Sequence, residues 1–577
     1  MKQIGSSLLC MAMVLSLVFA LVSCNRADHG TPDGITRATA QTTEIPEHHT
    51  GTPDEFSEVT ENPDEMPHDP DCEHVFLGES NVCSDCGKIR GTEDYIVFEV
   101  DEAAYAAAVD DAVIEQATEI ILPSKYQGYS VTKIGYCSFI NCDKLESITI
   151  PASVMKIELS PFGDCDSLKS ITVEEGNPNY HSDGNCLIDS SEKILVSGCT
   201  TSMIPDDGSV TSIGVEAFHG LDALETIVIP EGITNIENSA FYDCSHLTSI
   251  LLPHSLEEIK SYAFYECSGL TSISIPENVR WIDHGAFAGC TGLNGFTVDE
   301  NNQFYYAAGN CLIDINGTLI AGCKTSVIPD NGSVNSIGED AFRKFSNLVS
   351  ITIPDGIDSI GASAFAECVN LTSITIPDSV AIVGQLAFWR CDRLRYNSYE
   401  NGLYLGNHDN AFVLFVKAIN TSITTCEIHY YTNVICDSAF SGCNNLKSIQ
   451  ISDSVMYIGN WAFENCSSLT GITLPEYLMY IGDGAFKKCS SLKSIVIPEY
   501  APQIGAWASQ DCTSLTSITL PYLTSYIQIW TFSGCSSLTN IFYKGTKAYW
   551  RMIYKDSSWD EGTGNYTVHC TDGDIPK

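Results

Sequence analysis

A hydrophobic pattern with a period of 23 residues runs through most of the chain. Phe264 lies 23 residues after Phe241 and 23 residues before Phe287, and a cysteine stands three residues after each of them. A unit that recurs at a fixed period buries its apolar side chains against its neighbours, which is typical of a solenoid. The column that defines fourteen units contains Phe139, Phe162, Phe218, Phe241, Phe264, Phe287, Phe342, Phe365, Phe388, Phe440, Phe463, Phe486, Ser509 and Phe532.

Each unit also contains a predicted β-strand. The segment LTSISIP at 270–276 places Leu270, Ile273 and Ile275 in the L-x-x-I-x-I spacing of a leucine-rich repeat strand. Pro276 ends the strand because proline cannot continue to donate to a ladder. The returning half, typically I-G followed by A-F-x-x-C, places alanine and phenylalanine in the interior. We therefore predict an α/β-type repeat solenoid with 23-residue coils, a parallel sheet, few regular helices and β-hairpin insertions.

Three insertions interrupt the period. The phenylalanine spacing increases to 56, 55 and 52 residues before Phe218, Phe342 and Phe440, which places insertions near 173–212, 298–336 and 395–435. The first two are alike, and each has two short apolar runs around a polar turn, which predicts a β-hairpin that protrudes from the solenoid. The third departs from their pattern. Two cysteine pairs could face each other across the hairpins, as disulfides or as buried thiols: Cys186 with Cys199, and Cys311 with Cys323.

A cysteine column accompanies the phenylalanine column. Twelve units have cysteine at this position, so its role is repeated in nearly identical surroundings, whereas a nucleophile needs one special environment. Leu221 and Phe345 replace it in two units, and they can substitute for a packing group but not for a ligand or a bridge. We interpret the column as buried, reduced thiols.

The 23-residue unit, with its I-P, I-G and A-F-x-x-C marks, resembles the BspA-like leucine-rich repeat family of bacterial surface proteins. The resemblance covers roughly residues 120–555, with LPSKYQGYSVTKIG at 122–135 similar to an opening unit and the segment from Tyr543 to Trp550 similar to a closing one. It implies display at the cell surface and adhesion to host matrix proteins or other cells. It does not identify the ligand.

The N-terminus predicts export. An apolar run from Ile4 to Leu21 ends at Leu21-Val22-Ser23-Cys24, which resembles the lipobox of bacterial lipoproteins. We predict a signal peptide over 1–23 and lipidation of Cys24, so that the mature protein is anchored to the membrane at the bacterial cell surface. The alternative is a plain membrane anchor.

Residues 24–71 are predicted to form a tether between the lipid anchor and the folded part of the chain. Residues 24–71 contain twelve acidic and two basic residues with few large apolar side chains, so the segment cannot offset its ordering entropy and is expected to be disordered. A cysteine-histidine motif occupies 72–90, an N-terminal cap 92–130, the solenoid 131–543 and a C-terminal cap 544–577.

The motif at 72–90 predicts a structural zinc site. Cys72, His74, Cys83 and Cys86 supply a Cys3His set, and the C-x-x-C-G turn can direct two thiolates at one metal. Such a site is structural, since all four positions of the metal are filled by protein. The alternative is a pair of disulfides or unpaired residues on an oxidising surface. Zinc is the one cofactor that the sequence predicts.

Net charge limits the partners. The chain has 73 acidic and 29 basic residues, a net charge of -44, so it repels phosphate backbones, and we expect no nucleic acid to bind. An extracellular protein or glycan with a basic surface is favoured.

Two columns on the coil surface are candidate binding faces. The outward strand positions are mostly serine and threonine, which form a generic hydroxyl ladder without the aromatic anchors of binding hot spots. Five residues after the strand proline or its equivalent stand Trp281, Tyr457, Tyr480 and Tyr526. They form a candidate binding strip, with packing along the solenoid spine as the alternative.

The sequence therefore favours a non-catalytic, lipid-anchored surface protein for adhesion or protein interaction. The rival function is a surface polymer hydrolase or a glycan-binding protein with its site in the insertions. Neither a G-x-S-x-G nor an H-E-x-x-H motif occurs in the sequence, which argues against an enzyme.

Overall fold

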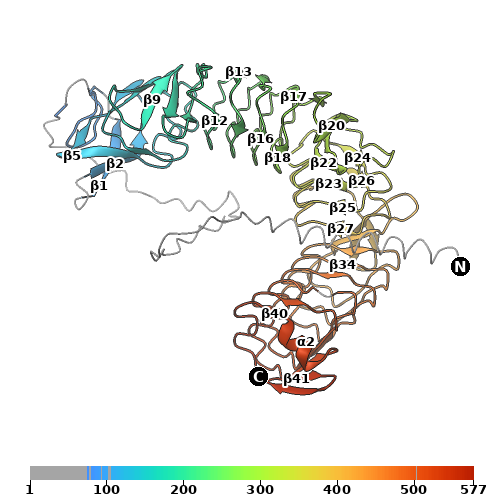
Figure 1. Ribbon diagram of the computed structural model, residues 1–577. Helices are drawn as coiled ribbons and strands as arrows, with labels where there is room; N and C mark the ends of the chain where they lie inside the picture. The colour runs from blue at the N-terminus through green and yellow to red at the C-terminus, as the bar shows by residue number, and fades with distance from the viewer. Residues whose placement is uncertain (1–74, 77–79, 92–93, 102–105, 502) are drawn as a thin grey trace. The chain divides into compact units, whose positions relative to one another are not determined.

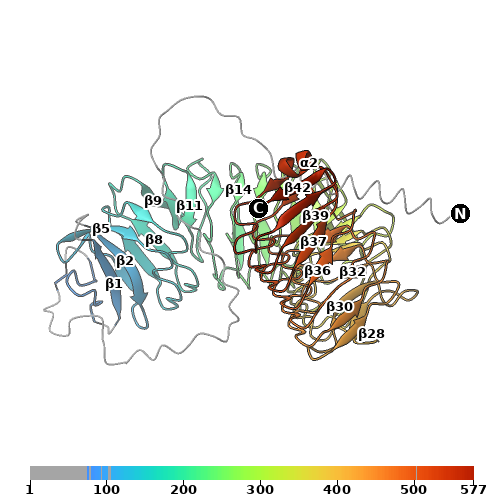
Figure 2. The same ribbon diagram turned by 90° about the horizontal axis from the view of Figure 1, so that it is seen from below.

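The computed structural model describes residues 75–577 apart from 77–79, 92–93, 102–105 and 502. Cys24 and the segments 1–23 and 24–71 lie outside the described residues. Consecutive coils follow one another in chain order along the solenoid (Figures 1 and 2), and the predicted leucine-rich repeat architecture is confirmed. Within the described part of the chain, no helix has the length and apolar character needed to span a membrane.

The L-x-x-I-x-I segments form parallel strands, as predicted. In β17, Ile273 and Ile275 are buried while Ser274 is exposed, which is the alternation expected of a strand with one face on the core. The strands of this first face are β3 (Glu119–Ile121), β6 (Ser147–Ile150), β8 (Ser170–Val173), β13 (Thr226–Val228), β15 (Ser249–Leu251), β17 (Ile273–Ile275), β19 (Phe296–Val298), β24 (Ser350–Thr352), β26 (Ser373–Thr375), β31 (Thr425–Glu427), β33 (Ser448–Gln450), β36 (Ser494–Val496), β37 (Ser517–Leu520), β39 (Asn540–Tyr543) and β41 (Thr567–Cys570).

A second parallel face, which the sequence did not predict, lies on the returning half of each coil. Most of its strands have only two residues, the second of which is a buried aliphatic residue, such as Ile259 paired with Ile282. The strands are β5 (Tyr129–Ile134), β7 (Lys156–Ile157), β12 (Ser212–Ile213), β14 (Asn235–Ile236), β16 (Glu258–Ile259), β18 (Trp281–Ile282), β23 (Ser336–Ile337), β25 (Ser359–Ile360), β27 (Ile382–Val383), β32 (Val434–Ile435), β34 (Tyr457–Ile458), β35 (Tyr480–Ile481), β38 (Tyr526–Ile527) and β40 (Tyr554–Lys555).

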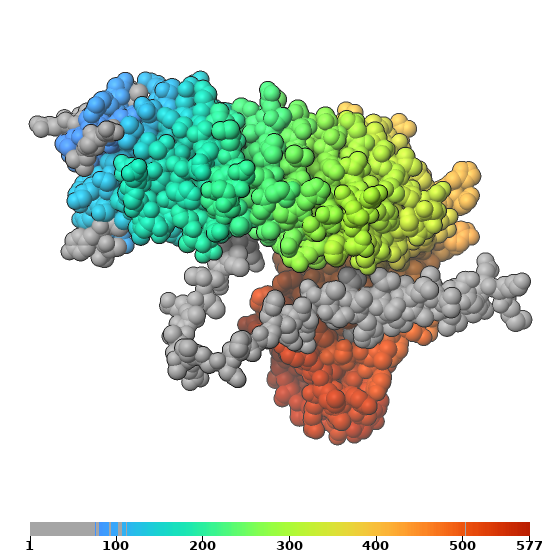
Figure 3. Space-filling view, turned by 45° about the horizontal axis from the view of Figure 1, so that its top comes forward, coloured from blue at the N-terminus to red at the C-terminus, as the bar shows by residue number. Residues whose placement is uncertain are grey.

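Rings of the phenylalanine column stack on one another between successive 23-residue coils in the interior. Phe264 is fully buried, and its ring lies 5.4 Å from that of Phe241 and 5.6 Å from that of Phe287, nearly parallel to both. Figure 3 shows the atoms of successive coils packed closely along the face that it presents. Phe264 thus contacts both neighbouring coils, so its stacking stabilises the packing of one unit against the next.

The cysteine column lies beside this stack and is buried, as predicted. The thiol of Cys267 donates to the carbonyl of Phe241 in the preceding coil at 3.0 Å, and Cys290 does the same to Phe264. Burial raises the pKa of both thiols above the ordinary range, so they stay protonated and unreactive. The sequence predicted their packing but not this hydrogen bond.

The insertions form antiparallel strands, but these do not protrude as free hairpins. They are β9 (Tyr180–Asp183), β10 (Cys186–Asp189) and β11 (Ile194–Ser197), then β20 (Tyr305–Ala308), β21 (Cys311–Asp314) and β22 (Thr318–Ala321), then β28 (Asn397–Tyr399), β29 (Gly402–Leu405) and β30 (Leu414–Ala418). The last strand of each set pairs in parallel with the next coil, β11 with β12, β22 with β23 and β30 with β32. Each insertion therefore extends the second face, because its last strand takes the place of a coil strand.

The paired cysteines of the first two insertions are buried thiols. Cys186, Cys199, Cys311 and Cys323 are fully buried, and no disulfide joins them in the described part of the chain. The Cys199 thiol lies 3.5 Å from the Asn185 carbonyl, and the Cys323 thiol 3.4 Å from that of Asn310. The sequence allowed either disulfides or buried thiols at these positions, and the structure shows buried thiols.

Both ends of the solenoid are covered. At the N-terminal end β1 (Tyr95–Asp101) pairs antiparallel with β2 (Ala106–Val113), β2 pairs in parallel with β5, and β4 (Lys125–Tyr126) flanks β5. At the C-terminal end α2 (Lys547–Met552) buries Trp550, and β42 (Gly573–Pro576) pairs antiparallel with β41. These elements cover strand edges that would otherwise invite pairing with other chains.

Candidate interaction surface

Half of the predicted zinc motif lies in the described residues. Cys83 and Cys86 are buried in a tight turn, closed by the Gly87 N–H, which donates to the Cys83 carbonyl at 3.0 Å. Gly87 is required there, since a Cβ would come within 2.0 Å of the Ile96 carbonyl oxygen. Cys72 and His74 lie outside the described residues. The zinc site therefore stays a prediction.

We expect protein purified under reducing conditions and without chelator to contain about one equivalent of zinc. Loss of one thiolate ligand removes most of the affinity of a tetrahedral site, so Cys83→Ser should lose the metal while Cys570→Ser, a change in the C-terminal cap, should keep it. Metal analysis of the three proteins is the measurement. Wild-type protein without zinc would contradict the prediction.

The four residues of the candidate binding strip occupy equivalent positions on the second face but differ in exposure. Tyr457 and Tyr480 are brought together, with rings stacked 4.7 Å apart, yet Tyr457 is only 9% exposed. Tyr526 is half-buried and donates to the carboxylate of Asp556. Trp281 is 55% exposed and lies in a different sheet, opposite Glu258. This column therefore offers a partner few exposed aromatic faces in the C-terminal coils.

A neighbouring column is exposed instead, at the turn that joins the first face to the second. In these turns the N–H of a buried residue donates to the carbonyl three residues earlier, as Leu478 donates to Pro475 at 3.2 Å and Ala501 to Pro498 at 3.2 Å. The two central residues of such a turn point away from the core. The central residues that are large form what we call the tyrosine patch: Tyr430, Tyr431, Tyr477, Tyr500, Tyr522 and Leu523.

The patch is well exposed and its rings contact one another. Tyr477 and Tyr500 are 46% and 47% exposed, and their rings stack 5.6 Å apart on adjacent coils. Tyr430 and Tyr431 lie 4.2 Å apart, and Tyr522 contacts Tyr549 of α2 at 5.3 Å. Rigid rings that are already packed together lose little conformational entropy when a partner binds.

Carboxylates are interleaved with the patch. The residues that precede Ser454, Tyr477 and Tyr500 in their turns are Asp453, Glu476 and Glu499; the first two are exposed and Glu499 is partly exposed. Glu499 pairs with Lys544 at 3.3 Å. A surface of aromatic faces and carboxylates attracts cationic side chains.

This surface was missed by the sequence analysis, although a signal for it exists. The equivalent turn position is small or polar in the coils before the third insertion: Ser153, Ser209, Gly232, Ser255, Asn278, Ser333, Gly356 and Ser379. From residue 431 onward it is Tyr431, Ser454, Tyr477, Tyr500 and Leu523. Large side chains at turn positions normally held by small residues indicate exposure and not packing.

Comparison with known proteins agrees with the leucine-rich repeat fold. The BspA type leucine rich repeat region matches residues 115–187, 196–312, 314–412 and 417–546, in 6 copies. No curated protein matches the chain.

Several solved structures are similar to the chain. A leucine rich cell surface protein from Faecalibacterium prausnitzii A2-165 is 27% identical, over 81% of this chain and 99% of that chain, with a TM-score of 0.32. A leucine-rich repeat protein from Bacteroides ovatus is 23% identical, over 82% and 98%, with a TM-score of 0.29. The pneumococcal vaccine antigen PcpA is 16% identical, over 83% and 98%, with a TM-score of 0.33. Because the family match covers more than half of the residues, the chain belongs to the BspA-type leucine-rich repeat family.

Proposed function

We propose that this protein is a recognition protein of the bacterial cell surface, which binds an extracellular protein partner through the tyrosine patch. Membership of a leucine-rich repeat family supports protein binding in general, since stacked coils provide an extended surface. The observation that carries the proposal is the run of exposed tyrosines on turns of the C-terminal coils, at a position that holds small or polar residues in earlier coils.

The tyrosine patch is better suited to specificity than the hydroxyl ladder. A surface that repeats almost unchanged in every coil cannot by itself distinguish partners, whereas the patch differs from coil to coil. Tyrosine supplies large contact area and a hydroxyl, and it is enriched in binding hot spots. The partner we propose carries lysine or arginine opposite Asp453, Glu476 and Glu499, which fits the net charge of -44.

Anchoring belongs to the same proposal. The signal peptide at 1–23 and lipidation of Cys24 would hold the mature chain at the membrane, and the acidic segment 24–71 would act as a tether that extends by self-repulsion. The solenoid would thereby be displayed at a distance from the lipid surface. Support for this arrangement comes from the sequence alone.

The test is a binding comparison with purified mature protein. A panel of extracellular matrix proteins is screened, and the dissociation constant of each bound protein is measured for wild type and for the triple variant Tyr431→Ser, Tyr477→Ser, Tyr500→Ser. Because a hot-spot residue contributes about 2 kcal/mol, we expect affinity to fall by at least about 30-fold. Binding should also weaken as salt is added, since carboxylates attract the partner.

Two control variants separate the patch from other surfaces. Tyr136→Ser with Trp281→Ser removes exposed aromatic residues elsewhere, and Ser249→Ala with Ser272→Ala and Ser373→Ala removes exposed hydroxyls of the ladder. Both controls should bind like wild type. Unchanged binding by the patch variant, together with loss in the ladder variant, would overturn the proposal.

A further inference from the structure

The coils on either side of the first two insertions meet directly. The Asp164 N–H donates to the His219 carbonyl at 3.1 Å across the first insertion, and the Gly289 N–H donates to the Arg343 carbonyl at 2.9 Å across the second. Side chains add to the second closure, where Lys344 pairs with Glu266 at 3.0 Å. At both insertions, the turn after the column phenylalanine of the preceding coil is therefore hydrogen-bonded to the equivalent turn of the following coil.

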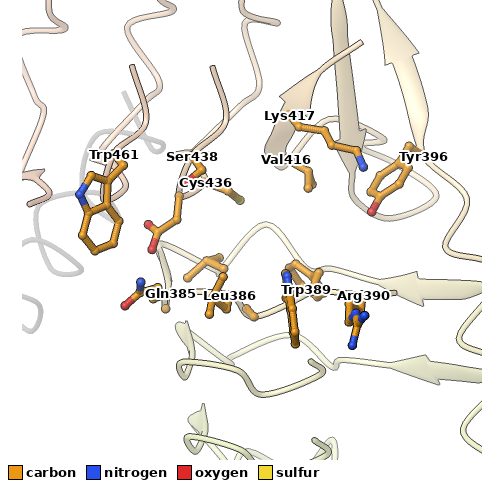
Figure 4. Close-up of a pocket in the computed structure, with 15 residues that line it drawn as sticks. Gln385, Leu386, Trp389, Arg390, Tyr396, Val416, Lys417, Cys436, Ser438 and Trp461 are labelled. Carbon is orange, nitrogen blue, oxygen red and sulfur yellow. The ribbon is translucent and has the colours of Figure 1, made fainter. Parts of the chain in front are cut away.

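The third insertion lacks this closure. The corresponding groups are the Arg390 N–H and the Ser441 carbonyl, and no hydrogen bond joins them in the part of the chain that the structure describes. A cavity of about 280 Å³ remains between the two turns, and we call it the third-insertion pocket. In Figure 4, Gln385, Leu386, Trp389 and Arg390 lie along one side, and Trp461, Ser438, Val416, Lys417 and Tyr396 lie along the other.

Two substitutions accompany the opening. The insertion residue that precedes the closing turn is small and buried in the first two insertions, Ser197 and Ala321, but is the exposed Lys417 in the third. The next residue is Gly198 in the first insertion, where a Cβ would come within 2.0 Å of the Phe218 ring, whereas the third insertion has Ala418. A methyl group at the position of Gly198 needs room that the first insertion does not have, so the third insertion must pack differently against the coil that follows it.

The lining combines aromatic faces with polar groups. Trp389 and Trp461 come from different coils, and Tyr396 comes from the start of the insertion. The Asp437 carboxylate also lines the pocket and accepts hydrogen bonds from the Asn460 N–H at 2.7 Å and from its side-chain amide at 3.1 Å. Burial raises the pKa of Asp437 to about 6, so its negative charge weakens in mildly acid solution.

Two cations contribute to the lining in a chain that is otherwise strongly acidic. The Arg390 guanidinium lies 5.0 Å from the centre of the Trp389 ring, and the Lys417 ammonium lies 5.2 Å from that of Tyr396. Cations that already cover these aromatic faces disfavour a cationic ligand and favour a ligand with a negative group.

Backbone donors at the pocket edge are unused. In the preceding coil, the N–H groups of Ser363, Phe365 and Glu367 donate to carbonyls of the next coil. Their equivalents are Leu386, Phe388 and Arg390, whose N–H groups have no hydrogen-bond partner among the described residues. The place of the next coil is taken by the pocket, so these donors are available to a ligand with hydroxyl or carboxylate oxygens.

We propose that the third-insertion pocket binds a sugar ring that carries a carboxylate, such as a uronic acid or a sialic acid. A sugar ring has an apolar face that packs on aromatic rings, and its hydroxyl rim needs the mixed donors and acceptors that Gln385, Ser438 and the unused N–H groups provide. Arg390 and Lys417 would pair with the carboxylate. The volume of about 280 Å³ suits one ring-sized unit and lies just below the usual range of ligand pockets. This site is separate from the tyrosine patch and does not depend on it.

The test uses purified mature protein with glucuronic acid, galacturonic acid and N-acetylneuraminic acid, and with glucose and galactose as neutral probes. Tryptophan fluorescence and calorimetry report binding. At least one acidic sugar should bind at least about tenfold more tightly than the neutral ones, because an ion pair with Arg390 or Lys417 adds a charge-assisted hydrogen bond.

Matched variants keep the test independent of folding. Trp461→Ala should weaken binding at least tenfold, whereas Trp507→Ala should leave it unchanged, because Trp507 occupies the same turn position two coils later and does not line the pocket. The double variant Lys417→Ser, Ala418→Gly copies the first insertion and should abolish binding by letting the turns close. The proposal is overturned if no acidic sugar binds, if neutral sugars bind equally well, or if Trp461→Ala binds like wild type.

Discussion

Replacing Phe264 with alanine should lower the free energy of unfolding by about 3–5 kcal/mol, the usual cost of removing a buried aromatic ring. The effect should be at the upper end of this range, because the ring stacks on Phe241 and on Phe287 and its loss weakens two interfaces between coils. Urea unfolding followed by circular dichroism measures the change. Since solenoid stability is a sum over neighbouring units, hydrogen exchange should show the loss concentrated near the substituted coil.

The matched control is Phe304→Ala, which removes an exposed phenylalanine near the start of the second insertion. This change should alter stability by less than about 0.5 kcal/mol, as surface substitutions usually do. If Phe264→Ala unfolds at the same urea concentration as Phe304→Ala, the phenylalanine stack does not hold the coils together.

Replacing Cys24 with alanine should release the protein from the membrane fraction of the producing cell. The proposed anchor depends on one thiol, since acyl chains on Cys24 supply about 0.8 kcal/mol per buried CH2 and nothing else in the proposal contacts lipid. Fractionation and electrophoretic mobility of wild-type and variant protein measure the result, and Cys570→Ala serves as the control that leaves Cys24 in place. A Cys24→Ala protein that remains in the membrane fraction with unchanged mobility would favour the plain membrane anchor instead.

Much of the fold could be predicted from the sequence because the core columns repeat. Phe264, Cys267 and Ile273 recur at fixed offsets, and a stacked solenoid is the arrangement that buries all of them in every unit. The second face could not be predicted in this way, since strands such as Glu258–Ile259 are too short to show a periodicity of their own. The short strands of the second face can be paired with one another only after the strands of the first face have set the register between coils.

The interaction surface shows where the sequence was insufficient. Tyr457 and Tyr477 are equally conspicuous in the sequence, but Tyr457 lies in a strand packed against the core cluster and Tyr477 lies at the centre of a turn. The direction of the Tyr477 side chain depends on the turn that contains it, which is closed by the Leu478 N–H donating to the Pro475 carbonyl. The third-insertion pocket is accompanied by a still finer detail, the methyl group of Ala418 in place of the hydrogen of Gly198.

We propose that this protein recognises its partner through the turns of its C-terminal coils. Hydrogen exchange of the mature protein, with and without a partner identified in the binding screen, tests it most directly because exchange maps the contact without any substitution. We expect protection at the turns that contain Tyr431, Tyr477, Tyr500 and Tyr522, with no change at the equivalent turns of Ser255 and Gly356. Protection confined to the strands of the serine and threonine ladder, or to the coils before the third insertion, would contradict it.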